Sequence, residues 1–284
     1  MRKVARRFGI LLFVIISCVS APQFIFAGID LTLIKQTNLD VQPLDIAISP
    51  DGKRIYVLAR GEILVYSIDE GKVSNRIPID EHFDKLICDI EDNILILSSS
   101  SSKTLKIIRV DFKYKISIDG LPFKGPADAP VTIAVFDDYQ WPYCARLEPL
   151  FQQVLDKYPN NVKLVVKNFP LSSHKFSYEA ATAALAANIQ GKFWEFHSLL
   201  FKNYNALNDA KIQDIAKELG LNMEKFNKDM QSPAIKSLIE RDIANGRQAG
   251  VYGTPTVFIN GKTAENRSLH GISQAIEAEL TKKK

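Results

Sequence analysis

Hydrophobic and polar residues alternate along the chain between about residues 43 and 120. Two stretches repeat this pattern about forty residues apart, and they begin L-D-I-A-I-S-P-D-G-K-R-I-Y-V-L and F-D-K-L-I-C-D-I-E-D-N-I-L-I-L. Alternation of period two is typical of half-buried β-strands. Turn signals such as Pro50-Asp51-Gly52 and Glu70-Gly71 separate the strands. The pattern therefore predicts an N-terminal unit of short antiparallel strands over residues 28–120.

The spacing of the two stretches adds a second expectation. A period of about forty residues is typical of four-stranded propeller blades, and the stretches resemble the repeats of exported β-propellers. No blade signature is complete, and two blades are too few to close a ring. We therefore expect an incomplete, propeller-like unit whose open edges are covered by the second domain, by another subunit or by residues 31–33. A small β-meander that mediates packing or assembly is the simpler alternative.

The pattern changes after residues 121–129, which are rich in proline and glycine and predict a linker. Residues 130–284 then alternate apolar strands with amphipathic helices, which predicts a second domain of the α/β class. The expected elements are a strand at 131–137, a helix at 142–157, a strand at 162–167, helices between 174 and 248, a strand pair formed by 255–260 and a short piece near Ser268, and a helix at 272–281.

The N-terminus has a targeting pattern. Four basic residues precede an uncharged apolar run from Phe8 to about Val19, which is short for a membrane span. Ile25-Phe26-Ala27 is an acceptable cleavage site, so the sequence predicts a signal peptide over residues 1–27. The surroundings of Cys18 also resemble a lipobox, and lipidation of Cys18 or an uncleaved anchor are the alternatives. Each alternative predicts an exported protein, periplasmic or extracytoplasmic.

Charge and cysteine content narrow the function classes. Removal of residues 1–27 lowers the formal charge from +4 to zero, so nothing suggests nucleic-acid binding. The mature form keeps only Cys88 and Cys144, too few for a disulfide scaffold. Cys88 alternates with polar neighbours, which favours a buried strand position. The histidines lack metal-ligand spacing and are interpreted as surface or packing residues. No nucleotide fingerprint occurs. We expect neither a metal nor a cofactor.

Residues 136–146 read F-D-D-Y-Q-W-P-Y-C-A-R and join the first strand to the first helix of this domain. At such a junction P-Y-C normally follows a cysteine, because a thiolate at a helix N-terminus is stabilised by unpaired N–H groups and by the macrodipole. Here Trp141 occupies the attacking position, and Cys144 occupies the position of the resolving thiol. Pro142 and Tyr143 lie between them and tune how strongly the helix end favours a thiolate.

The second half of the site is expected at Gly253-Thr254-Pro255, before the last strand pair. A cis proline there would bring the Thr254 backbone beside the redox motif and let it pair with an extended substrate. Asp137 and Asp138 end the first strand of the domain. One of them is a candidate proton acceptor for the resolving thiol, although turn and capping roles are favoured.

Five separated motifs occur in a recognisable order: F-D-D-Y-Q-x-P-Y-C, K-N-F-P-L (167–171), A-A-T-A-A-L-A-A (180–187), Q-G-K-F-W-E-F-H (190–197) and G-T-P-T-V-F-I-N-G (253–261). Through them, residues 121–284 resemble the exported DsbA-like thiol–disulfide oxidoreductases. The resemblance implies a thioredoxin fold with an inserted helical subdomain. It also implies exchange with extracytoplasmic thiol or disulfide proteins and with a redox partner protein. The departure is the missing first cysteine.

Three interpretations of Trp141 follow. In the first, tryptophan is genuine and the protein is a non-catalytic peptide-binding or scaffold protein that has lost its nucleophile. In the second, a UGA codon for selenocysteine was translated as tryptophan, and the lower pKa of a selenol would favour the ionised nucleophile. In the third, a single-base error or mutation replaced cysteine, because Cys and Trp codons differ by one base.

The sequence as a whole predicts a two-domain α+β protein. Its N-terminal part is an antiparallel, incomplete propeller-like β-repeat unit, and its C-terminal part is an α/β thioredoxin fold with an inserted helical subdomain. The leading function is thiol–disulfide or selenol–disulfide exchange, and the alternative is non-catalytic binding of extended peptides at Thr254 and Pro255. The β-repeats are expected to pack on the thioredoxin domain or to form a homo-oligomer.

Overall fold

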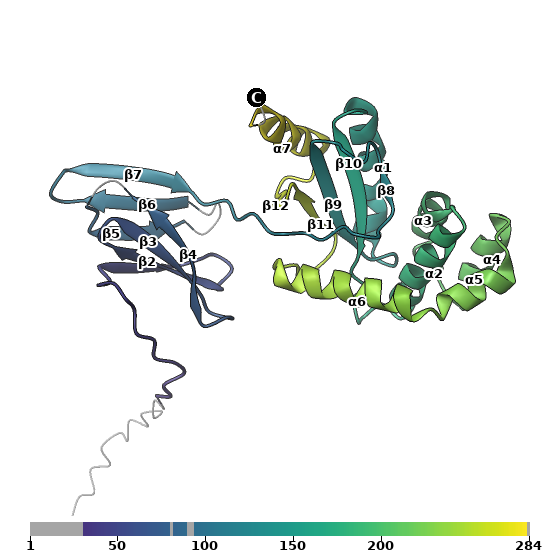
Figure 1. Ribbon diagram of the computed structural model, residues 1–284, viewed down its shortest axis with the longest axis horizontal. Coiled ribbons are helices and arrows are strands. Elements are labelled where there is room, and N and C mark those ends of the chain that lie inside the picture. The colour runs from purple at the N-terminus through teal and green to yellow at the C-terminus, as the bar shows by residue number, and fades with distance from the viewer. Residues whose placement is uncertain (1–30, 80–81, 90–93, 283–284) are drawn as a thin grey trace, which may run out of the picture.

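The computed structural model describes residues 31–79, 82–89 and 94–282. An antiparallel β unit and a larger α/β unit lie side by side and are joined by an extended segment (Figure 1). This arrangement confirms the expected α+β fold class. The predicted signal peptide over residues 1–27, with its alternative at Cys18, lies outside the described residues. No helix in the described ranges is long and apolar enough to cross a membrane.

The β unit consists of two antiparallel sheets. The first has four strands, β1 (Asp45–Ile48), β2 (Arg54–Ala59), β3 (Glu62–Ser67) and β4 (Lys72–Pro78). The second has three strands, β5 (Lys85–Cys88), β6 (Ile94–Ser99) and β7 (Thr104–Arg109). Alternate residues of both sheets face a shared core that contains Tyr56, Leu58, Ile63, Val65, Leu86, Leu95 and Leu97. Within the described ranges the strands of this β unit form two separate sheets and no closed ring.

The second repeat lacks the fourth strand that completes the first. Residues 113–119 instead run along the α/β unit, where the Tyr114 N–H donates to the Gly261 carbonyl at 2.8 Å. A Cβ on Gly261 would lie 2.2 Å from the Tyr114 carbonyl oxygen, so this approach requires glycine. Tyr114 and Ile116 pack against the buried cluster around Phe136 and Phe258. Burial of these side chains explains why the segment leaves the second sheet.

Residues 121–129, the expected linker, also differ from the prediction. Phe123–Lys124 form β8, an edge strand that pairs antiparallel with β10 (Val162–Asn168). Leu121 is buried in the core of the helical insertion. The proline- and glycine-rich stretch therefore follows the edge of the sheet and does not form a free linker. The α/β unit begins before residue 121.

The α/β unit is built on a five-stranded sheet of order β12-β11-β9-β10-β8. β9 (Val131–Asp137) runs parallel to β10, and β11 (Thr256–Ile259) runs antiparallel to β9. Helices α1 (Pro142–Lys157) and α7 (Leu269–Thr281) cover one face through a cluster that includes Phe151, Val154, Ile272 and Ile276. This is the expected thioredoxin fold.

The last strand pair ends earlier than the sequence pattern suggests. β12 is Lys262–Thr263, directly after the turn at Asn260-Gly261, and Ser268 is not part of a strand. The Ser268 side chain instead accepts a hydrogen bond from the Gly271 N–H and caps α7. The predicted hairpin at Asn260-Gly261 is confirmed, and its second strand is displaced from the position near Ser268 because serine caps a helix there.

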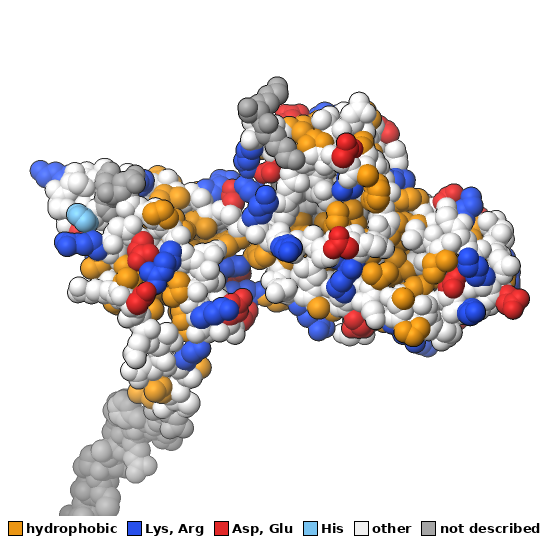
Figure 2. All heavy atoms as spheres, in the orientation of Figure 1, with side chains coloured by type: hydrophobic (Ala, Val, Ile, Leu, Met, Phe, Trp, Pro, Cys, Tyr) orange, Lys and Arg blue, Asp and Glu red, His pale blue; other side chains and the backbone are white. Residues whose placement is uncertain are grey.

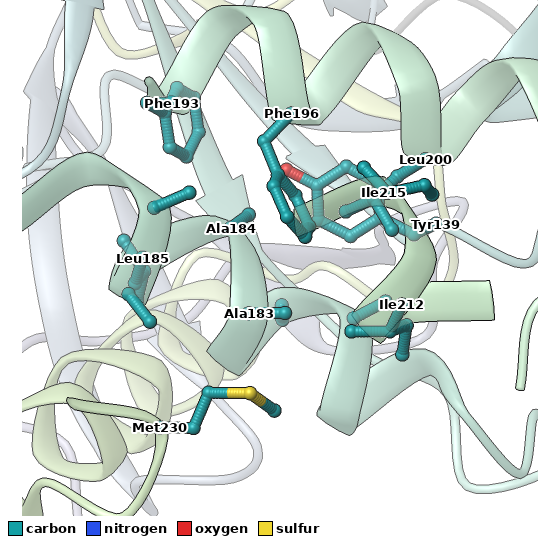
Figure 3. Packing of buried hydrophobic residues seen from close by; sticks show 14 of the residues in the cluster. Tyr139, Ala183, Ala184, Leu185, Phe193, Phe196, Leu200, Ile212, Ile215 and Met230 are labelled. Atoms are coloured by element: carbon teal, nitrogen blue, oxygen red, sulfur yellow. The ribbon is translucent and has the colours of Figure 1, made fainter. Parts of the chain in front are cut away.

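The helical subdomain is inserted between β10 and β11. It contains α2 (Ser177–Ile189), α3 (Phe193–Lys202), α4 (Asp209–Glu218), α5 (Met223–Met230) and α6 (Pro233–Gln248). The alanine-rich α2 is buried and lets its neighbours approach closely. Tyr139, from the loop after β9, lies among these helices beside Phe196 (Figure 3). The insertion therefore anchors the loop that carries residues 138–141.

Helix α6 covers the other face of the sheet. Gly246 permits the close approach, because a Cβ there would lie 2.8 Å from the rings of Phe136 and Phe169. The buried Lys167 ammonium donates to Asp242 of α6 at 2.5 Å and to the Ser117 carbonyl at 2.6 Å. These contacts connect the end of β10, α6 and the incoming segment 113–119.

The two units also touch directly. The Arg54 guanidinium donates to the Tyr114 hydroxyl at 2.5 Å, and the Lys53 ammonium lies 3.2 Å from the centre of the Tyr252 ring. Figure 2 shows the two lobes meeting at a narrower junction. The β unit therefore packs on the thioredoxin fold, which is one of the two arrangements expected.

Candidate functional site

The site begins where β9 passes into α1. Trp141 is the N-cap of α1 with extended backbone, and Pro142 occupies the first turn, where its missing N–H costs nothing. Three residues later Cys144 faces inward and is 1% exposed. Tyr143 points to solvent, with 55% of its surface exposed. The helix start thus places position 141 at the surface of the site and the Cys144 thiol beneath it.

The expected second half of the site lies opposite. The Thr254–Pro255 peptide bond is cis, as the sequence analysis expected. A groove of about 600 Å³ is lined by Trp141, Tyr143, Arg146, Leu147, Thr254, Pro255 and Arg267. The fold therefore brings four of the six predicted residues to one groove. Pro142 and Cys144 do not line it, because Pro142 starts the helix and Cys144 is buried below.

The surroundings of Cys144 disfavour its thiolate. Burial and the nearby Asp137 carboxyl group raise the pKa of the Cys144 thiol far above its usual value, whereas an interaction with Thr254 acts in the opposite direction. A lone Cys144 is therefore a protonated, unreactive thiol at neutral pH. It needs a proton acceptor to become a nucleophile.

Asp137 lies next to this thiol at the end of β9. Burial raises the pKa of its carboxyl group to about 7, and the interaction with Cys144 lowers it in part. Its Oδ1 has no hydrogen-bond partner within the described ranges. A carboxyl group with a pKa near neutrality and an unused acceptor atom is suited to take a proton from Cys144.

Asp138 has a different role. Its carboxylate accepts hydrogen bonds from the Gln140 and Leu171 N–H groups, each at 2.8 Å, and lies 2.9 Å from His174 Nδ1. Asp138 therefore holds the loop before α1, as the turn interpretation predicted. Asp137, and not Asp138, is positioned to accept a proton from Cys144.

Planar side chains form a row across the start of α1. The Trp141 ring lies 5.5 Å from the His174 ring and 5.2 Å from the Tyr143 ring, both in tilted stacking. The Arg146 guanidinium lies over the Tyr143 ring, 4.2 Å from its centre. Sequence reasoning missed His174, Arg146 and Arg267. His174 closely follows the K-N-F-P-L motif, and this proximity was the one available signal.

Comparison with solved structures agrees with this geometry. A thioredoxin-like oxidoreductase from Silicibacter pomeroyi DSS-3 is 30% identical and aligns with a TM-score of 0.52, over 57% of this chain and 94% of that chain. Oxidised BdbD from Bacillus subtilis is 27% identical with a TM-score of 0.52, over 60% of this chain and 98% of that chain. Both likenesses cover somewhat more than half of this chain.

Among curated proteins, a Na(+)/H(+) antiporter NhaA 1 from Salinispora arenicola is 32% identical over 154 residues. The match covers 54% of this chain and 24% of the antiporter, so the chain spans about a quarter of that relative's length. A family model described as thioredoxin matches residues 119–278, more than half of the chain. The chain therefore belongs to the thioredoxin family.

Proposed function

We propose that this protein is an exported thiol–disulfide oxidoreductase that acts on extracytoplasmic polypeptides. The observation that supports the proposal best is the buried carboxyl group of Asp137 beside the Cys144 thiol. A buried acceptor without a hydrogen-bond partner is costly for folding. Such a cost is explained if Asp137 removes a proton during catalysis.

The roles follow from the positions of the residues. A selenolate or thiolate at position 141 attacks one sulfur of a substrate disulfide, and the other substrate sulfur leaves as a thiolate. Cys144 then gives its proton to Asp137 and attacks the selenium or sulfur at 141. This step releases the second substrate thiolate and leaves a bond between positions 141 and 144. The substrate gains two electrons, and a redox partner protein resets the pair. The reverse sequence oxidises a substrate dithiol.

The proposal requires selenium or sulfur at position 141. Of the three interpretations of Trp141, selenocysteine and a sequencing error at a cysteine codon supply it, whereas a tryptophan that is present in the native protein, by mutation or otherwise, does not. Mass spectrometry of the peptide that contains residue 141, purified from the native source, together with the codon, distinguishes all three. A genuine tryptophan in the native protein would contradict the enzymatic proposal.

The alternative function is binding of extended peptides without catalysis. The observation that favours it is the aromatic part of the groove lining, Trp141 and Tyr143, whose rings lie 5.2 Å apart, with the His174 ring 5.5 Å from that of Trp141. Both tryptophans, Trp141 and Trp194, lie in the thioredoxin fold. Tryptophan fluorescence of the protein with Trp141, measured during titration with a cysteine-free peptide, therefore tests this function. Saturable quenching of the tryptophan fluorescence would support binding, and an unchanged signal would contradict it.

His174 is expected to favour the ionised nucleophile. Its ring lies beside position 141 while Asp138 holds Nδ1, so a protonated imidazole would stabilise an anion there. In a Trp141→Cys background, His174→Asn should raise the pKa of the new thiol by about one unit. Thiolate absorbance against pH measures this, and His82→Asn on the β unit is the matched control. An unchanged pKa would contradict the role of His174.

A further inference from the structure

The groove carries a positive charge that the redox chemistry does not require. Arg146 and Arg267 both line it, on the sides of α1 and of the loop before α7. No acidic side chain lines the groove in the part of the chain that the structure describes. Neither arginine forms an ion pair within these ranges, so both positive charges face the groove without compensation.

Each guanidinium is oriented by a single neutral contact. Arg267 donates to the Pro255 carbonyl, which fixes it beside the cis-proline loop. Arg146 lies over the Tyr143 ring at 4.2 Å. A guanidinium has five N–H donors in a fixed plane and matches a carboxylate in a bidentate geometry. Both arginines therefore keep donors available while their positions are already restricted.

Two carboxyl groups close to the start of α1 are engaged elsewhere. Asp138 is bonded to the loop N–H groups and lies against His174. Glu148, one turn along α1 from Cys144, accepts from Ser198 on α3. The positive end of the α1 dipole adds to the potential at the same place. The uncompensated charge is available to a ligand.

We infer that the groove selects polypeptide segments that carry acidic side chains close to the residue facing position 141. The inference rests on the proposed function only in that an extended polypeptide occupies the groove. Aspartate or glutamate on the ligand would pair with Arg146 and Arg267 while its backbone passes Thr254 and Pro255. Neutral segments of the same shape would bind more weakly, and basic segments would be repelled.

Fluorescence anisotropy of labelled peptides with the full-length protein tests the inference. The three cysteine-free peptides are identical except at the two positions that flank the residue facing position 141. These two positions are both Glu, both Gln or both Lys. We expect the Glu peptide to bind about tenfold more tightly than the Gln peptide at low ionic strength, since exposed ion pairs contribute modestly and additively. The difference should shrink as salt rises.

Arg146→Gln and Arg267→Gln should each weaken binding of the Glu peptide about threefold and leave the Gln peptide unchanged. Arg247→Gln, at the end of α6 and outside the groove, is the matched control and should change neither. Arg146 is an exposed helix residue, so its variant should fold as the parent does, as circular dichroism can verify. Equal affinities for the Glu and Gln peptides would overturn the charge selection and leave peptide binding intact. Absence of binding by all three peptides would overturn peptide binding itself.

Discussion

Replacement of Trp141 by cysteine is expected to raise dithiol-dependent insulin reduction by about two orders of magnitude or more over the chain as written. With tryptophan at 141, no pair of thiols exists that could form and resolve a mixed disulfide. Cys144 alone is 1% exposed, and burial with Asp137 nearby keeps it protonated. Cysteine at the N-cap of α1 would place a thiol at a helix N-terminus, where its anion is stabilised.

The double variant Trp141→Cys/Cys144→Ser is the matched control. It should accumulate the mixed disulfide with substrate and fail to turn over, because attack is retained and resolution is lost. The rise in activity should therefore depend on both positions. A folded Trp141→Cys protein that remains inert would show that the surrounding site no longer supports exchange, and the enzymatic proposal would fail.

Asp137→Asn is expected to stabilise the protein above neutral pH by up to about 4 kcal/mol. Burial raises the pKa of Asp137 from 3.8 to about 7 in the folded state. Below the pKa that Asp137 has in the unfolded chain, its carboxyl group is protonated in both the folded and the unfolded state and does not destabilise the fold. As pH rises towards 7, the unfolded state ionises first, so the wild-type protein loses stability; above 7 the loss is complete. Asparagine is neutral at every pH, so the variant does not undergo this loss of stability.

Urea unfolding followed by tryptophan fluorescence at about pH 4 and about pH 8 measures this difference. The variant and the parent should be nearly equal at the acidic pH and should diverge at the alkaline pH. Asp138→Asn is the matched control with the opposite sign, since that carboxylate accepts two backbone hydrogen bonds and its variant should lose about 1–3 kcal/mol. A pH-independent effect of Asp137→Asn would contradict the raised pKa.

Other groups that titrate between these pH values do not alter the comparison. His197 is buried, and desolvation lowers its pKa to about 3, so the folded protein loses stability as pH falls below the unfolded histidine value. This loss is common to parent and variant. The difference between the two proteins therefore isolates Asp137.

The order of elements in the thioredoxin fold was predictable from local sequence. Helix α1 spans Pro142–Lys157, as expected from apolar spacing and from the proline at its start. Strands β9 and β10 were expected because each is a short, predominantly apolar run, and the structure pairs them in parallel. In the β unit, alternation predicted both antiparallel sheets. These features depend on periodicity and on turn residues, which act over a few positions along the chain.

Some local sequence patterns are compatible with two different structures. For these segments the sequence was not sufficient to predict the fold. Residues 113–119 alternate as a strand does, yet their partner is the Gly261 carbonyl in the other unit. Phe123–Lys124 lie in a proline- and glycine-rich stretch, yet they pair with β10. Such pairings depend on which apolar surface is available after folding, and neither segment carries that information alone.

At the site, the sequence by itself determined the redox motif and its missing first cysteine, because spacing around a helix N-terminus is a local property. The position of Thr254-Pro255 opposite the motif was expected from the family resemblance, because the two segments are far apart in the sequence. Tertiary structure alone decided the roles of the neighbours. It buried Asp137 against Cys144 while binding Asp138 to the loop, although the two carboxylates are adjacent in sequence. It also placed His174, Arg146 and Arg267 around the groove. Burial and charge at a point in space depend on segments that meet only in the folded chain, which is why periodicity could not predict them.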